Sequence, residues 1–329
     1  MPGPARGGGA SRRAALASAV VLAGVLASAL PAAGLTFFAI ATGGTGGTYY
    51  PLGGMLAQLL SNQVKDLVAT AQAGNASVAN ILLVGRGEIE SAFAQNDVAY
   101  WAYTGTGLEP FRGRPVGNIR HVASLYPEHV QLVATRASGI RSVRDLAGRR
   151  VVLGARGSGN VVEAEAILEA YGMSPSDLEA VYAGHSEGVS RIEDGQADAM
   201  FVVAGFPTAA LVDLAAGTDV VIVPLDDDAV RRLAARSRFF TPAVVPAGTY
   251  RGQTQDVRTV AVMATWIVDE RVPADLVYEM TKALWAKRDV LEAVHPKGRE
   301  VRLETALAGM AIPPHPGAER YYRERGLLP

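Results

Sequence analysis

Short apolar segments alternate with helical segments along most of this 329-residue chain, and the alternation limits the possible folds more than any other feature. Residues 35–41 form an apolar run that ends in glycines, which predicts a buried strand. Residues 48–60 follow with Leu52, Leu56 and Leu59 on one helical face. The same alternation predicts further strands at 67–72, 90–95, 122–125, 130–135, 150–154, 180–182, 198–203, 220–224 and 257–268, and further helices at 77–85, 98–103, 161–171, 188–193, 207–216, 228–235 and from 274 onward. An α/β fold with mostly parallel sheets flanked by helices is therefore predicted.

The composition excludes several classes of function. The chain is 49% hydrophobic and 19% charged, which is enough apolar material for a packed core. Its net charge of -1 gives no electrostatic basis for a nucleic-acid partner. Cysteine is absent, so disulfides, cysteine-ligated metals and cysteine nucleophiles are excluded. The five histidines show no metal-binding spacing, and we expect neither a metal nor a cofactor.

The first 29 residues have the three parts of a secretory signal peptide. Arg6, Arg12 and Arg13 precede an uncharged run, and Ala27-Ser28-Ala29 supplies the small residues that a signal peptidase requires. We therefore predict a signal peptide over 1–29 and a periplasmic or otherwise extracytoplasmic protein. The alternatives are a membrane anchor over the same run and, because of Ser11-Arg12-Arg13, export by the twin-arginine route.

The remaining residues are long enough for about two domains. No low-complexity linker separates them, so any two lobes must be joined by strands. The apolar runs 130–135 and 257–268 are the predicted crossovers. Lobe I is then predicted over 35–130 plus 261–329, and lobe II over 131–260.

Three glycine-containing turns between a strand and a helix carry the predicted chemistry. They span 43–50, 154–160 and 204–208. Glycines allow close approach of a ligand to the backbone, and free N–H groups at a helix start bind anions. The first turn lacks the third glycine of a dinucleotide-binding fingerprint and the Gly-Lys-Ser/Thr of a P-loop. An anion-binding cleft is predicted, and the alternative is three tight turns without a ligand.

The chain resembles the TAXI family of solute-binding proteins, which serve TRAP transporters. The resemblance rests on TGGTGGTYYPLGG (42–54), NDVAYWAY (96–103), LYPEHVQLVA (125–134), SGIRSVRDLAGRRVVLGARGSG (138–159), DGQADAMFVVAGFPTAA (194–210), PAGTYRGQTQDV (246–257) and HPGAERYYRERG (315–326). It implies a two-lobe fold like the type II periplasmic binding proteins. It also implies a monomeric receptor, not an enzyme, that captures a small organic anion in the cleft and delivers it to TRAP membrane permease subunits. The implied ligands are glutamate-like compounds, dicarboxylates and 2-oxoacids.

The family motifs also imply a set of ligand-binding residues. These are Thr45, Gly46, Tyr50, Asn96, Tyr100, Gly157, Ser158, Gly159, Asn160, Gly205, Phe206 and Pro207. Asn160 stands where the family usually has threonine. Arg156 stands where a small residue or proline is common, and it is either solvated or able to reach an acid of the ligand. Both departures leave the exact ligand open.

Two other functions fit parts of the sequence. The same fold could serve as a surface or sensor protein without transport. Gly184-His185-Ser186-Glu187-Gly188 also matches the Gly-x-Ser-x-Gly pattern of serine hydrolases, with His295 and His315 downstream. In the resembled family this stretch is a strand end followed by a helix start, where Ser186 and Glu187 suit capping.

Overall fold

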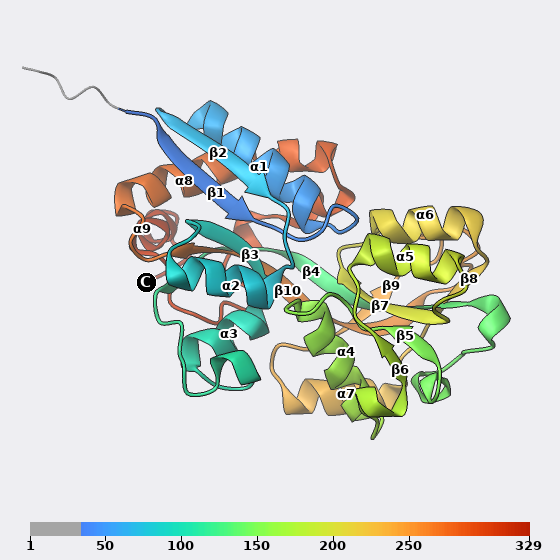
Figure 1. Cartoon of the computed structure of the whole chain (residues 1–329). Coiled ribbons are helices and arrows are strands. Elements are labelled where there is room, and N and C mark those ends of the chain that lie inside the picture. Colours follow the sequence, from blue (N-terminus) through green and yellow to red (C-terminus); the bar gives the residue numbers. More distant parts are fainter. Residues whose placement is uncertain (1–33) are drawn as a thin grey trace, which may run out of the picture. The chain divides into compact units, whose positions relative to one another are not determined.

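A computed structural model describes residues 34–329, so the predicted signal peptide lies outside the described part (Figure 1). The strands are β1 Thr36–Ala41, β2 Leu67–Gln72, β3 Ser91–Gln95, β4 Ile119–Thr135, β5 Arg150–Val152, β6 Glu179–Val181, β7 Ala199–Ala204, β8 Val220–Val223, β9 Thr241–Val245 and β10 Val257–Asp269. The α-helices are α1 Tyr49–Gln63, α2 Ser77–Arg86, α3 Asn96–Thr104, α4 Gly159–Ala170, α5 His185–Glu193, α6 Ala209–Gly217, α7 Asp227–Arg236, α8 Ala274–Lys287 and α9 Pro316–Glu324. The predicted alternation of strands and helices is confirmed.

Two strands differ from the prediction. Segments 122–125 and 130–135 are parts of one continuous strand, β4, because the polar residues between them remain extended inside the sheet. Strand β9 was not predicted. Only Val245 of its residues is fully buried, so it has no apolar run to reveal it.

The sheet is mixed, with its parallel pairs grouped at the two ends. Its strand order is β2-β1-β3-β10-β4-β7-β5-β6, with β8 on β4 and β9 on β10. The pairs β1–β2, β1–β3, β5–β6 and β5–β7 are parallel, as helical crossovers require. The long strands β4 and β10 are antiparallel to each other and to their other partners, so the sheet is less parallel than predicted.

Strands β4 and β10 connect two separate sets of hydrophobic clusters (Figure 1). Two clusters use residues from 38–126 and 264–322, on the two faces of the sheet beneath α1 and α8 and beneath α2 and α3. Two others use only residues from 130–262, beneath α4 and α7 and beneath α5 and α6. This division supports the lobe boundaries predicted from the sequence, which we retain as a proposal: lobe I is 35–130 plus 261–329, and lobe II is 131–260.

Within the described residues, every helix is too short or too polar to cross a membrane.

Candidate functional site

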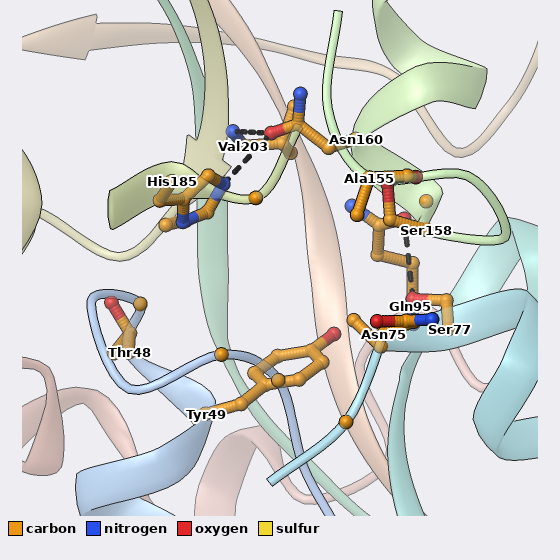
Figure 2. Close-up of a pocket in the computed structure, with 18 of the residues that line it drawn as sticks. Thr48, Tyr49, Asn75, Ser77, Gln95, Ala155, Ser158, Asn160, His185 and Val203 are labelled. Carbon is orange, nitrogen blue, oxygen red and sulfur yellow. Dashed lines mark hydrogen bonds between the residues drawn. The ribbon is translucent and has the colours of Figure 1, made fainter. Parts of the chain in front are cut away.

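A cavity of about 390 Å³ lies where helices from both proposed lobes begin (Figure 2). Thr48 and Tyr49 line it at the start of α1, and Ala76 and Ser77 at the start of α2. Two helices of lobe II also begin at its wall. Their lining residues are Ser158 and Gly159 at the start of α4, and Gly184 and His185 at the start of α5. Backbone N–H groups in the first turn of a helix have no intrahelical acceptor, and the helix dipole is positive there. Four such ends around one cavity favour an anion.

The backbone around the cavity is held in unusual conformations. Ala76 precedes α2 with φ 63° and ψ −151°, a region populated almost only by glycine. Gly154 has φ 120°, and a side chain there would meet Asn160 at 2.8 Å. Glycine is therefore required at 154, where the strand turns toward α4.

Asn160 at the start of α4 forms hydrogen bonds with the segment after β5, with β7 and with the start of α5. Its Nδ2 donates to the carbonyls of Leu153 at 2.7 Å and Phe201 at 3.0 Å. Its Oδ1 accepts from the backbone N–H of Val203 at 2.6 Å and lies 3.1 Å from Nε2 of His185. Since Asn160 is buried, these bonds fix the end of β7 relative to α4 and α5.

His185 is expected to be neutral and to carry its proton on Nε2. Asn160 Oδ1 can only accept, so His185 Nε2 must be the donor in the bond between them. Burial lowers the pKa of His185 to about 4. The native state then binds fewer protons than the unfolded chain between pH 6.5 and 4. The contribution of His185 to the free energy of unfolding is therefore full above pH 6.5 and is lost as the pH falls from 6.5 to 4.

We predict that ¹⁵N NMR of His185 shows the Nε2–H tautomer unchanged from pH 8 to pH 5.5. Protonation should begin only near pH 4. His185→Gln serves to assign the signals. A titration of this ring near pH 6.5 would contradict the assigned hydrogen bond.

Glu128 on β4 contributes a buried carboxyl group to the cavity. The hydroxyl of Tyr49 donates to its Oε2 at 2.7 Å. The pKa of Glu128 is raised to about 8, chiefly by burial; the Tyr49 hydrogen bond opposes the shift, and the nearby Asp97 adds to it. Glu128 is therefore mostly protonated at neutral pH and adds little negative charge to the site.

The remaining charges leave the cavity favourable for an anion. Arg156 is the one arginine or lysine among the described residues that line it, and its guanidinium stacks 3.8 Å from the ring centre of Tyr182. Glu187 forms a salt bridge of 2.7 Å with Arg191 on the exposed face of α5. Among residues 34–329, no group of three His, Asp or Glu side chains is placed to hold a metal ion.

The structure brings the predicted turns together, but it places their residues differently. Of the twelve predicted binding residues, Ser158, Gly159 and Asn160 line the cavity. The other nine lie outside its lining: Thr45, Gly46, Tyr50, Asn96, Tyr100, Gly157, Gly205, Phe206 and Pro207. All of these except Tyr100 and Pro207 are one or two positions from a lining residue. Gly43, Gly44, Gly47, Gln95, Val203 and Ala204 line it in the same segments. The role of the twelve predicted residues in binding stays a prediction.

Most of those nine residues have structural partners instead. Thr45 and Tyr50 are exposed. Four of the others form contacts between the two proposed lobes through their backbone carbonyls. The Gly46 carbonyl accepts from the N–H of Ala210, and the Gly157 carbonyl accepts from the N–H of Ala79. The Gly205 carbonyl accepts from the hydroxyl of Thr48, and the Pro207 carbonyl lies 3.0 Å from His295 Nε2. Asn96 binds the backbone of Met263 and Gly309, Tyr100 packs on Phe239, and Phe206 packs on His129. The contacts of Gly46, Gly157, Gly205 and Pro207 hold the two proposed lobes against each other.

Sequence reasoning did not assign the starts of α2 and α5 to the site. Gly74-Asn75-Ala76-Ser77 is a turn followed by a helix, the same signal that identified the first two turns. Glu128 was visible as an acid within an apolar strand. The α5 turn was noted, but it was interpreted as a capping sequence or a hydrolase motif.

Neither downstream histidine is placed as a base for Ser186. His295 Nε2 lies 3.0 Å from the Pro207 carbonyl, and His315 Nε2 lies 3.3 Å from the Glu270 carbonyl. Ser186 itself sits in the first turn of α5 against Gly46. The geometry gives no support to the serine hydrolase alternative.

Comparison with known proteins identifies the family. The model of the NMT1-like family matches residues 40–326. The chain belongs to the NMT1-like family. Its fold is also similar to that of solved structures at 13–16% sequence identity.

Three of these structures illustrate the fold. A protein of Bordetella bronchiseptica RB50 matches with a TM-score of 0.52 and 14% identity, over 89% of each chain. A structure described as a periplasmic transporter matches with a TM-score of 0.51 and 13% identity, over 88% of this chain and 92% of that one. A Listeria monocytogenes protein, provisionally assigned to an L-cystine ABC transporter, matches with a TM-score of 0.50 and 16% identity, over 82% of this chain and all of that one. This NMT1-like chain thus has the α/β fold of type II periplasmic binding proteins, as predicted.

Proposed function

We propose that this NMT1-like protein is an extracytoplasmic solute-binding receptor for a small organic anion. The observation that carries the proposal is the cavity enclosed by the first turns of α1, α2, α4 and α5, two helices from each proposed lobe. A ligand that contacts both lobes favours the closed arrangement, since those contacts exist together only when the lobes meet.

The donors are sufficient for a useful affinity. A charge-assisted hydrogen bond from a backbone N–H to a carboxylate contributes about 1.5–3 kcal/mol. Two or three such bonds, with Tyr49 and Tyr182 as aromatic walls, account for the roughly 8 kcal/mol of a micromolar binder. Arg156 is the one arginine or lysine among the described lining residues. Because most of the donors are neutral, the site can also release its ligand.

The ligands that fit these donors are glutamate-like compounds, dicarboxylates and 2-oxoacids. A cavity of about 390 Å³ has room for molecules of this size. By its sequence resemblance to TAXI proteins, we further propose that the receptor delivers its ligand to a TRAP-type permease. Uptake by membrane vesicles that requires an ion gradient and is independent of ATP would support this transporter class.

A thermal-shift screen of these three ligand classes tests the receptor proposal. At 100 times its dissociation constant, a true ligand adds roughly 2.7 kcal/mol to the free energy of unfolding. We expect at least one organic anion to raise the melting temperature, and the uncharged amide of that compound to have a much weaker effect. If no anion in the screen raises the melting temperature, and none co-purifies with the protein, the proposal fails.

A further inference from the structure

Two carboxyl groups are fully buried where the proposed lobes meet, and neither of them lines the cavity. Asp97 lies in the first turn of α3 in lobe I, and Glu163 lies on α4 in lobe II. Both side chains are 0% exposed. Val162, next to Glu163, packs on the lobe I cluster, whereas Ala164 belongs to a lobe II cluster. Glu163 is thus placed at the boundary itself.

Three of the four carboxyl oxygens of Asp97 and Glu163 have no hydrogen-bond partner. Oδ1 of Asp97 accepts from the backbone N–H of Val98 at 2.7 Å. Oδ2 of Asp97 and both carboxyl oxygens of Glu163 are buried without a partner. The two carboxyl groups are neighbours, since each acts on the pKa of the other through a side-chain hydrogen bond. Two carboxylates cannot bond to each other, since each can only accept. One added proton turns one of them into a donor and completes the pair.

We propose that Asp97 and Glu163 form a proton-binding site in which the two carboxyl groups share one proton across the lobe boundary. The proton is placed on Glu163, which donates to Oδ2 of Asp97. Asp97 keeps the negative charge because the N-terminus of α3 and the Val98 N–H stabilise it.

The surroundings favour the protonated pair. The titratable side chains that act on it from neighbouring elements are Glu128 on β4 and, around Glu128, Tyr49 on α1 and Tyr126 on β4. Burial raises the pKa of Glu163 well above its usual range, and the charge of Asp97 raises it further, as does that of Glu128 once Glu128 is ionised. Burial also raises the pKa of Asp97, against the hydrogen bonds that lower it. Among residues 34–329, neither Asp97 nor Glu163 forms a salt bridge.

Proton binding then couples pH to the contact of Glu163 on α4 with Asp97 in lobe I. Above the ordinary pKa of glutamate, the closed native state holds a proton that the unfolded chain lacks. The stability that this proton provides is full below that pKa and is lost as the pH rises through the pKa of the pair. Separating α3 from α4 hydrates both carboxyl groups and releases the proton, so acid favours closed lobes.

The Glu163→Gln variant tests the proposal, because glutamine keeps the shape and donates to Asp97 without a proton. We expect the ratio of wild-type to Glu163→Gln unfolding constants, measured by urea denaturation of the ligand-free chain, to rise about tenfold per pH unit above pH 5. Below about pH 7 Glu128 is protonated in the native state of both proteins, so its contribution cancels from the ratio in that range. The matched control is Glu169→Gln, which changes an exposed glutamate of the same helix and should give a flat ratio. A flat ratio for Glu163→Gln would overturn the proposal.

A second measurement does not require the Glu163→Gln protein to fold. Infrared spectra at pH 7 should show protonated carboxyl groups in the wild type, and one of them should remain in Glu128→Gln. The protonated carboxyl signal that is missing in Glu128→Gln belongs to Glu128. In the wild type this signal should fade as the pH rises through about 8, the pKa of Glu128. If Glu128→Gln retains no protonated carboxyl group, the proposal is wrong. Neither experiment uses a ligand, so the receptor proposal is tested separately.

Discussion

Gly184→Asp should abolish binding of organic anions while leaving the protein folded. Gly184 lines the cavity and precedes α5 with φ −68° and ψ 170°, a conformation open to any residue, and a side chain there meets no atom within 4 Å. An aspartate at this position would accept from the free N–H groups of α5 itself and would repel a bound carboxylate. We expect the affinity for the ligand to fall by at least about 100-fold, the equivalent of one or two lost charge-assisted hydrogen bonds.

The matched control is Gly184→Asn, which has nearly the same size and capping ability without the charge. Its affinity should fall by less than about tenfold. Both variants should unfold at a urea concentration equal to or slightly above that of the wild type, because each gains a helix cap worth a few tenths of a kcal/mol. Isothermal titration calorimetry measures the affinities. Equal losses for the aspartate and the asparagine would show that size, and not an anion site, is responsible.

Asn160→Ala should have the largest effect on stability of any single change in the cavity wall. It removes two donated hydrogen bonds and two accepted ones, and it leaves the carbonyls of Leu153 and Phe201 and the N–H of Val203 buried without that partner. Each buried polar group without a partner costs about 1–3 kcal/mol. We expect the free energy of unfolding to fall by about 3–5 kcal/mol.

The comparison for this change is Asn75→Ala, at an exposed asparagine of the same cavity. Its effect on the free energy of unfolding should stay within about 0.5 kcal/mol, as for most exposed positions. Urea denaturation followed by circular dichroism measures both. A loss below about 1 kcal/mol for Asn160→Ala would mean that the carbonyls and the N–H find other partners, and that the asparagine does not hold the wall together.

The local sequence was sufficient for the fold because its signals act over a few residues. Periodicity located β1, α1 and most of the later elements, since a strand or a helix must bury one face or one stripe of its own residues. The glycine turns marked where helices begin, because a positive φ or a close backbone approach restricts the residue type at that point. Strand β9 lacked such a signal, since its pairing with β10 provides its stability and most of its side chains stay exposed.

The predicted turns border the cavity, but the sequence could not specify which of their residues line it. The sequence indicated that residues 43–50 and 154–160 supply free N–H groups, and both segments border the cavity. It did not indicate which residues of a turn face the ligand and which face the other lobe. Gly46 meets Ala210 and Ser186, for example, while Gly47 borders the cavity. That choice depends on the position of α5 and α6, which are far from Gly46 in the sequence.

The sequence alone thus determined the α/β fold through periodicity, and the chemistry of helix N-termini led to the proposal of an anionic ligand. The tertiary structure decided which four helix starts enclose the cavity. It also placed Glu128 at the cavity wall and brought Asp97 against Glu163. The physical reason is distance along the chain. Hydrogen bonding and burial of charge are set by neighbours that the fold brings together from segments many residues apart, and a local pattern carries no information about those neighbours.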